Sequence, residues 1–180
     1  MAKVLVIYGT TEGQTAKVSQ HVADVGRRLG HDVDVCHAAD LGDDFALDAY
    51  DAAFVGASVH EGRHQRYLVR WVKDHAGWLK THPSAFFSVC LAAASPFPEE
   101  VEDAEAIIDR FAARTGWFPS SRTLVAGALR YSQYNWLKRM VMKQIAKKEG
   151  GDTDTSQDHE YTDWNALTEW GEHFYRGLAA

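Results

Sequence analysis

The chain has 180 residues, of which 46% are hydrophobic, so it can bury one substantial core, and a single domain over residues 1–180 is expected. Its formal net charge of −6 argues against a nucleic-acid-binding protein, because such proteins normally carry a basic surface. No apolar run approaches the roughly 20 residues of a membrane-spanning helix, which predicts a cytoplasmic protein whose membrane contact, if any, is peripheral to the inner face of the cell membrane.

The elements alternate between strand-like and helical patterns along the chain. Short apolar runs predict strands at Lys3–Tyr8, Asp32–Cys36, Ala52–Gly56, Ala85–Val89 and Thr123–Ala126. Helical spacing and capping residues predict helices at Gln14–Leu29, Arg66–Leu79, Glu99–Thr115 and Asp163–Tyr175. Between the second and third strands the pattern indicates an acidic loop with one helical turn. The alternation predicts an α/β fold with a doubly wound, five-stranded parallel sheet, most simply in the order 2-1-3-4-5.

The only cysteines of the chain, Cys36 and Cys90, lie in or beside these apolar runs. This placement favours buried free thiols over a disulfide or a metal-binding pair, and no metal site is predicted. Such cysteine usage fits a reducing, cytosolic compartment.

The turn after the first strand carries the strongest functional signal. Val4–Ile7 is a short β-branched run, as expected for a parallel strand covered on both faces. The backbone N–H groups of the following helix start and the hydroxyls of Thr10, Thr11 and Thr15 should therefore point at one spot, which suits a phosphate. The turn contains no Lys or Arg, so dipoles and hydroxyls must balance the charge. It is neither a Walker loop nor the Gly-x-Gly-x-x-Gly of dinucleotide folds.

This turn, Tyr8-Gly9-Thr10-Thr11-Glu12-Gly13-Gln14-Thr15, resembles the FMN-phosphate loop of flavodoxins, whose usual form is Thr/Ser-x-Thr-Gly-x-Thr. The alternative is an ordinary capped turn, since Thr and Gly are common there. The resemblance implies a flavodoxin-like fold and an FMN phosphate held by the residues Thr10, Thr11, Glu12, Gly13, Gln14 and Thr15. Because a carboxylate repels a phosphate dianion by about a kcal/mol or more, the side chain of Glu12 is expected to point outward.

Two further loops should face the same site, because ligands of doubly wound sheets bind beyond the carboxyl ends of the strands. They are residues 57–64 and 90–98, and they are rich in small residues but contain no Trp or Tyr. One face of a bound flavin would then stay open to another planar molecule, with Phe97 as a partial cover. The expected cofactor contacts here are Ser58, Val59, His60, Gly62, Val89, Leu91, Ala92 and Ala93. His60 and His64 fit solvated surface histidines at least as well as a proton-transfer role.

Residues 129–162 are too many for a simple connection and indicate an insertion between strand five and the last helix. No acidic residue lies between Ala128 and Lys148. Apolar residues recur there at helical spacing opposite the basic residues Arg139, Lys143 and Lys147. Three uses remain open for this amphipathic pattern: a solvated face over ordinary core, a contact with anionic lipid, or a cover for an acidic apolar substrate.

Further segments resemble the bacterial flavodoxin-like, quinone-dependent protoporphyrinogen oxidases, and the resemblance covers nearly the full length. These segments are Gly56-Ala57-Ser58, Pro83-Ser84-Ala85-Phe86-Phe87-Ser88-Val89, Ala126-Gly127-Ala128-Leu129-Arg130-Tyr131, Gly150-Gly151-Asp152-Thr153-Asp154-Thr155 and Tyr161-Thr162-Asp163-Trp164. Ordinary flavodoxins lack the third and fourth of them. The resemblance implies an FMN enzyme of heme biosynthesis that oxidises protoporphyrinogen IX to protoporphyrin IX and passes the electrons to a respiratory quinone.

Within the insertion, the resemblance implies contacts with substrate or quinone at Arg130, Tyr131, Lys138 and Arg139, and a cofactor contact at Asp154. It also implies peripheral membrane contact through Trp136–Lys148. The loop Leu91–Pro96 lacks the basic residues of some members, which would weaken binding of the porphyrinogen propionates.

Two other functions compete with the enzyme. A flavodoxin-type electron carrier without its own substrate would be favoured by acidic residues and aromatic rings around the flavin, and the sequence has neither. A phosphoacceptor receiver domain needs acids at the ends of the first and third strands. Those ends are Tyr8-Gly9-Thr10 and Gly56-Ala57-Ser58, which argues strongly against a receiver domain.

Overall fold

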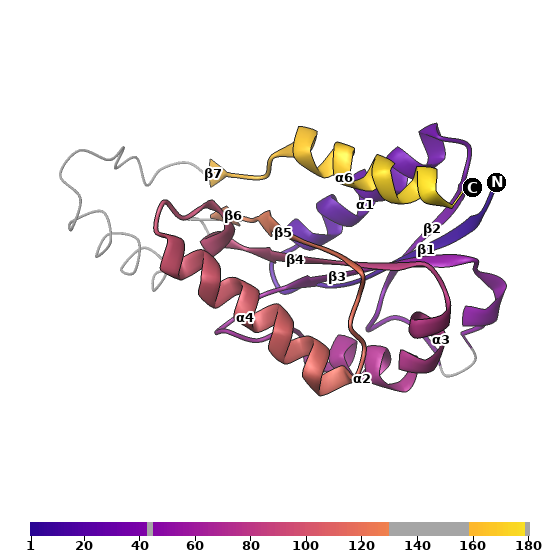
Figure 1. Cartoon of the computed structure of the whole chain (residues 1–180), viewed down its shortest axis with the longest axis horizontal. Helices are drawn as coiled ribbons and strands as arrows, with labels where there is room; N and C mark the ends of the chain where they lie inside the picture. Colours follow the sequence, from indigo (N-terminus) through magenta and orange to yellow (C-terminus); the bar gives the residue numbers. More distant parts are fainter. Residues whose placement is uncertain (43–44, 130–158, 179–180) are drawn as a thin grey trace.

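The computed structural model describes residues 1–42, 45–129 and 159–178. They form a five-stranded parallel sheet in the order β2-β1-β3-β4-β5, with helices on both faces (Figure 1). The predicted fold class and strand order are therefore confirmed. The strands are β1 Lys3–Gly9, β2 Asp32–His37, β3 Ala52–Ser58, β4 Ser84–Cys90 and β5 Ser121–Ala126.

Within the described residues, two helices cover one face of the sheet and three cover the other (Figure 1). The first face carries α1 Gln14–Arg28 and α6 Trp164–Gly177, and the second carries α2 Arg66–Asp74, α3 Ala76–Thr81 and α4 Pro98–Thr115. Short 3₁₀ turns, η1 Leu47–Ala49 and η2 Leu91–Ala94, complete the connections. None of the helices in the described ranges is both long enough and apolar enough to cross a membrane.

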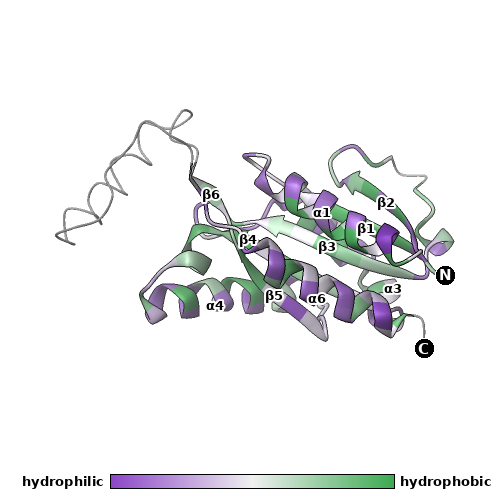
Figure 2. Ribbon diagram, turned by 90° about the horizontal axis from the view of Figure 1, so that it is seen from above, coloured by the Kyte–Doolittle hydropathy of each residue, from purple (hydrophilic) through white to green (hydrophobic). Residues whose placement is uncertain are grey.

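Each strand sends alternate side chains into two hydrophobic cores, because successive side chains of a strand point to opposite faces. In β1, Val4 and Val6 belong to the core beneath α1 and α6. Leu5 and Ile7 belong to the core beneath α2 and α4. Burial on both faces explains why the strand sequence is an unbroken apolar run. In Figure 2 the helices are striped with hydrophilic and hydrophobic colour, as expected for helices with one face on a core.

Close packing of α6 on α1 depends on a glycine in α1. A Cβ at Gly26 would lie 2.4 Å from the ring of Tyr175, which is fully buried in this core. Only glycine leaves space for the ring at this crossing. The C-terminal helix is thereby fixed on the helix that follows the first loop.

The structure differs from the predicted elements in two places. The helix predicted over Arg66–Leu79 is two helices, separated at His75, whose φ and ψ of −109° and 13° leave the helical range. Gly77, a poor helix former, follows the break. The second difference is a small antiparallel pair of strands, β6 Ala128–Leu129 and β7 His159–Glu160, where the chain enters and leaves the insertion. Strands this short carry too little periodicity to be predicted.

Candidate functional site

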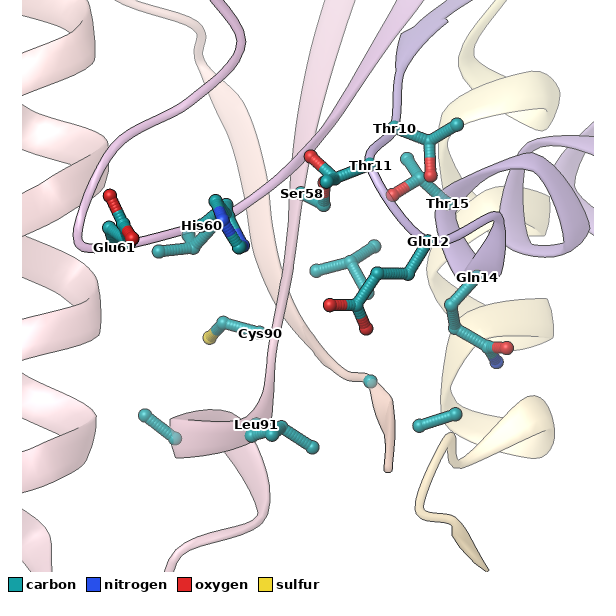
Figure 3. Close-up of a pocket in the computed structure, with 15 residues that line it drawn as sticks. Thr10, Thr11, Glu12, Gln14, Thr15, Ser58, His60, Glu61, Cys90 and Leu91 are labelled. Atoms are coloured by element: carbon teal, nitrogen blue, oxygen red, sulfur yellow. The ribbon is translucent and has the colours of Figure 1, made fainter. Parts of the chain in front are cut away.

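A pocket of about 220 Å³ lies at the carboxyl ends of β1, β3, β4 and β5 (Figure 3). This is the edge at which doubly wound sheets bind ligands. The predicted cofactor residues that line the pocket are Thr10, Thr11, Glu12, Gln14, Thr15, Ser58, Val59, His60, Val89, Leu91 and Ala92. The structure therefore brings together residues from all three loops.

The other predicted residues lie elsewhere. Gly13 forms the N-cap of α1 without lining the pocket, Gly62 lines a second cavity, and Ala93 lines a third. Phe97, predicted as a partial cover, is 37% exposed and is not part of the pocket lining. The remaining predicted residues lie outside the described residues: Arg130, Tyr131, Lys138, Arg139, Asp154 and the segment Trp136–Lys148.

Four lining residues were not predicted: Glu61, Cys90, Gly127 and Ala128. Gly127 and Ala128 follow the carboxyl end of β5, and the motif Ala126-Gly127-Ala128 was the signal that could have identified them. Cys90 ends β4, and burial raises the pKa of its thiol. Cys36 and Cys90 are both free, as predicted, although Cys36 is only half-buried.

The loop between β1 and α1 has the features of an anion site. Gly13 adopts the left-handed conformation, with a φ of 87°, and its N–H donates to Thr10 Oγ1 at 2.9 Å. The first turn of α1 contains no acidic residue, so its N-terminal dipole is not compensated there. Thr15 is fully buried, and its Oγ1 has no hydrogen-bond partner among the described residues. An unpaired buried hydroxyl at a helix start fits a loop built to bind an FMN phosphate.

Two side chains from the start of α2 fix this loop. The hydroxyl of Tyr67 accepts from the Thr10 N–H at 3.1 Å and donates to the Thr10 carbonyl at 3.2 Å. The Tyr67 hydroxyl oxygen also lies 3.0 Å from Nε2 of His37. Burial raises the pKa of Tyr67. Gln65 Nε2 donates to Thr11 Oγ1 at 3.0 Å and to Ser58 Oγ at 2.6 Å. Gln65 therefore joins the first loop to the end of β3.

The prediction that Glu12 points outward is wrong. Its half-buried side chain lines the pocket, and its carboxylate lies between the loop and the opposite wall (Figure 3). The left-handed turn at Gly13 follows directly and sets the direction of the chain there, which sequence spacing does not show. The carboxylate therefore adds negative charge to a pocket whose other features favour an anion.

The insertion joins the body of the protein beside the same pocket. Thr162 Oγ1 donates to the Ala126 carbonyl at 2.7 Å and accepts from Gln14 Nε2 at 3.1 Å. Lys17 and Glu160 form an ion pair at 3.2 Å. The residues that end the insertion are thus bonded both to the end of β5 and to the first turn of α1.

Comparison with known proteins agrees with this architecture. Residues 5–156 match the flavodoxin domain family. Protoporphyrinogen IX dehydrogenase (quinone) of Escherichia coli strain K12 is 33% identical over 165 residues, which are 92% of this chain and 90% of that protein. The enzyme of the same name from Leishmania major is 32% identical over 175 residues, covering 96% of this chain and 74% of that protein.

Solved flavodoxins share the fold at low sequence identity. Oxidised flavodoxin 1 from Bacillus cereus is 16% identical with a TM-score of 0.59, covering 97% of each chain. A short-chain flavodoxin associated with a PDU bacterial microcompartment is 14% identical with a TM-score of 0.62, covering 100% of each chain. These likenesses imply an oxidoreductase of the kind that uses an FMN-type flavin. The chain belongs to the flavodoxin domain family, and within it to the group of the quinone-dependent protoporphyrinogen IX dehydrogenases.

Proposed function

We propose that this protein oxidises protoporphyrinogen IX to protoporphyrin IX with FMN as cofactor and a respiratory quinone as electron acceptor. The observation that carries the proposal is the lining of the pocket. Among the described residues, its lining contains no Phe, Tyr or Trp, and its rim includes Gly127 and Ala128, from which the chain continues into the insertion. A flavin seated there keeps one ring face free for a flat substrate.

The residues of the first loop would hold the FMN phosphate. The Thr15 hydroxyl has no hydrogen-bond partner among the described residues, so it can bond to a ligand, and the helix start supplies backbone N–H donors. Tyr67 and Gln65 keep the loop in place. When bound there, FMN would supply the two-electron redox chemistry that links substrate oxidation to quinone reduction.

The other two loops would position the ring and exclude water. Val59, Val89, Leu91 and Ala92 give the pocket an apolar wall close to backbone. The Val59 N–H donates to the Val89 carbonyl at 2.9 Å, so the start of the second loop is fixed to the end of β4, from which the third loop continues. A rigid, small-residue wall of this kind suits a planar ring.

We assign substrate or quinone contacts to Arg130, Tyr131, Lys138 and Arg139 in the insertion. Arg130 and Tyr131 follow Ala128, which lines the pocket, so the chain itself keeps their backbone within about 11 Å of that rim. Guanidinium and ammonium groups there suit propionate carboxylates. Trp136–Lys148 would contact the cytoplasmic face of the membrane, where a respiratory quinone is available.

The test is an anaerobic assay of the purified protein. We expect a yellow protein whose released chromophore is FMN, and porphyrin fluorescence that rises in step with quinone reduction. Arg130→Ala should raise the Michaelis constant for porphyrinogen and leave FMN content unchanged. Loss of FMN in that variant would contradict its assigned role.

A flavodoxin-type electron carrier is the second candidate, favoured by the structural likeness to flavodoxins. A carrier would bind FMN and exchange electrons with a protein partner without porphyrinogen turnover. FMN content without porphyrin formation, in the presence of quinone, would therefore replace the first proposal with the second.

A further inference from the structure

A second cavity lies on the face of the sheet covered by α2 and α4, and it shares no lining residue with the pocket described above. Its volume is about 430 Å³, within the range of small-molecule sites. The end of the β3–α2 loop forms one wall and one face of α4 forms the other. Three of its lining residues are arginines: Arg63, Arg110 and Arg114. We call this cavity the arginine groove.

The arginines of the groove are not neutralised by nearby carboxylates. Within the described residues, no ion pair joins any of them to an acidic group. Arg110 and Arg114 lie one turn apart on α4, and no acid occupies a position three or four residues from either. By contrast, Arg122 of β5 forms ion pairs with Glu105 and Asp109 of α4. Three guanidinium groups are thus gathered in a chain whose formal net charge is −6.

Arg63 is held at the groove by a tight turn. His60 and Arg63 exchange backbone hydrogen bonds of 2.9 and 3.1 Å across Glu61 and Gly62. Both turn residues have positive φ, 50° and 72°, as in two-residue hairpin turns. The turn therefore fixes the backbone of Arg63 at the wall of the groove.

A histidine side chain forms part of the groove floor. His64 is 8% exposed and packs edge-on against Phe86 and Phe111. Its Nε2 lies 3.0 Å from Ser88 Oγ. The Ser88 hydroxyl can donate or accept, so the ring can carry its proton on either nitrogen. Burial, and secondarily Arg110, lower the pKa of His64 to about 4, so the ring is neutral near pH 7.

We propose that the arginine groove is an anion site that takes a phosphate group. Guanidinium forks bind phosphate oxygens bidentately, and Arg63, Arg110 and Arg114 supply three of them around one cavity. A bound anion selects the His64 tautomer with the proton on Nδ1, and Ser88 then donates to Nε2. A free phosphate compound and a phospholipid headgroup share this chemistry.

The first test is a titration of the full-length, FMN-saturated protein with inorganic phosphate at constant ionic strength. Saturating FMN fills the phosphate loop, and the ring nitrogens of His64, followed by ¹⁵N NMR, report on the groove alone. We expect a saturable shift toward the Nδ1–H tautomer. The double variant Arg110→Gln/Arg114→Gln should weaken this response at least about tenfold.

The control variant Arg28→Gln/Arg176→Gln removes the same charge from α1 and α6, on the other face of the sheet, and should leave the response unchanged. A His64 shift of equal affinity in both double variants overturns the proposal. The absence of a His64 shift with phosphate, together with equal sedimentation on anionic and neutral vesicles, also overturns it. Because His64 is the reporter, this outcome does not depend on whether the protein oxidises porphyrinogen.

The second arm identifies the source of the phosphate. Sedimentation with vesicles of phosphatidylglycerol, compared with phosphatidylcholine, tests the headgroup. Binding to the anionic vesicles that falls in Arg110→Gln/Arg114→Gln but not in Arg28→Gln/Arg176→Gln supports a lipid headgroup. A His64 response to inorganic phosphate without such vesicle binding supports a free phosphate compound.

Discussion

The pocket at the strand ends and the arginine groove are both suited to anions, but they use opposite means. The pocket relies on a helix start, threonine hydroxyls and backbone geometry, and the carboxylate of Glu12 lines it. The groove relies on guanidinium groups around a buried neutral histidine. The fold fixes the dipoles and hydroxyls of the pocket in place. The charges of arginine side chains at a surface, in contrast, are screened by salt.

The two sites achieve selectivity in different ways. A loop without cations binds an anion only when several short hydrogen bonds form together, so it selects shape and holds one ligand tightly. A cluster of arginines attracts any anion of the right size, and its affinity falls as the ionic strength rises. We therefore expect the FMN affinity to depend less on salt than the response of the groove to phosphate.

The largest expected effect belongs to His64. The pKa of this residue is lowered to about 4 in the folded protein, chiefly by burial, so the unfolded state binds a proton more readily. The stability it contributes is present above the unfolded pKa of about 6.5 and is lost as the pH falls toward 4. The loss should be about 3 kcal/mol in the free energy of unfolding, measured by urea denaturation between pH 7 and pH 4.

The variant His64→Gln should flatten this part of the pH profile, and His173→Gln, exposed on α6, should not. Phosphate in the groove should oppose the acid loss, because an anion beside Arg110 raises the pKa of His64. An unchanged pH profile in His64→Gln would show that His64 does not cause the loss.

The next effect concerns Thr15. Replacing it with Val keeps the shape of the side chain and removes the buried hydroxyl that has no partner. If that hydroxyl serves the FMN phosphate, the affinity for FMN should fall about 10- to 100-fold, as expected for a hydrogen bond to a charged group. The stability of the FMN-free protein should not fall, because no bond within the protein is lost.

Ser19→Ala is a matched control for Thr15→Val. Ser19 is also fully buried in α1 with no partner for its hydroxyl, but it does not line the pocket. Fluorescence quenching on FMN titration should therefore be unchanged in Ser19→Ala. Equal losses of FMN affinity in Thr15→Val and Ser19→Ala would mean that a change within α1, not a lost contact in the pocket, weakens FMN binding.

The sequence predicted the strands of the sheet because strand and helix periods are local patterns. The strand order came from the topology of doubly wound sheets, and most of the pocket lining came from the resemblance to flavodoxins together with that topology. An apolar run that ends in Thr and Gly marks both a buried strand and the loop after it. The position of Glu12 was mispredicted for a different reason: it depends on the left-handed turn at Gly13. Sequence shows that glycine permits such a turn, not which way the preceding side chain then points.

Contacts between distant segments could not be predicted either. Tyr67 and Gln65 bond to the first loop, more than 50 positions earlier in the chain. The helical pattern of α2 shows which residues face the core, but not that its first turn reaches the loop after β1. The arginine groove likewise joins residues from two elements and has no sequence motif.

Tyr67→Phe tests the support that the first loop receives. The change removes the hydroxyl that bonds both backbone groups of Thr10 and leaves the Thr10 N–H without that partner. We expect FMN to bind about tenfold more weakly, since a loosened loop must be ordered again on binding. Tyr50→Phe, which removes a hydroxyl bonded to Asp34 away from the pocket, should leave FMN affinity unchanged.

Glu12→Gln gives the smallest expected effect and bears most directly on how the two anion sites differ. The carboxylate of Glu12 lies in the pocket, where it repels a phosphate dianion by about a kcal/mol. The variant should therefore bind FMN about fivefold more tightly in low salt, with a smaller gain in high salt. Weaker binding would mean that Glu12 accepts a hydrogen bond from the ligand, so that its charge is part of the site.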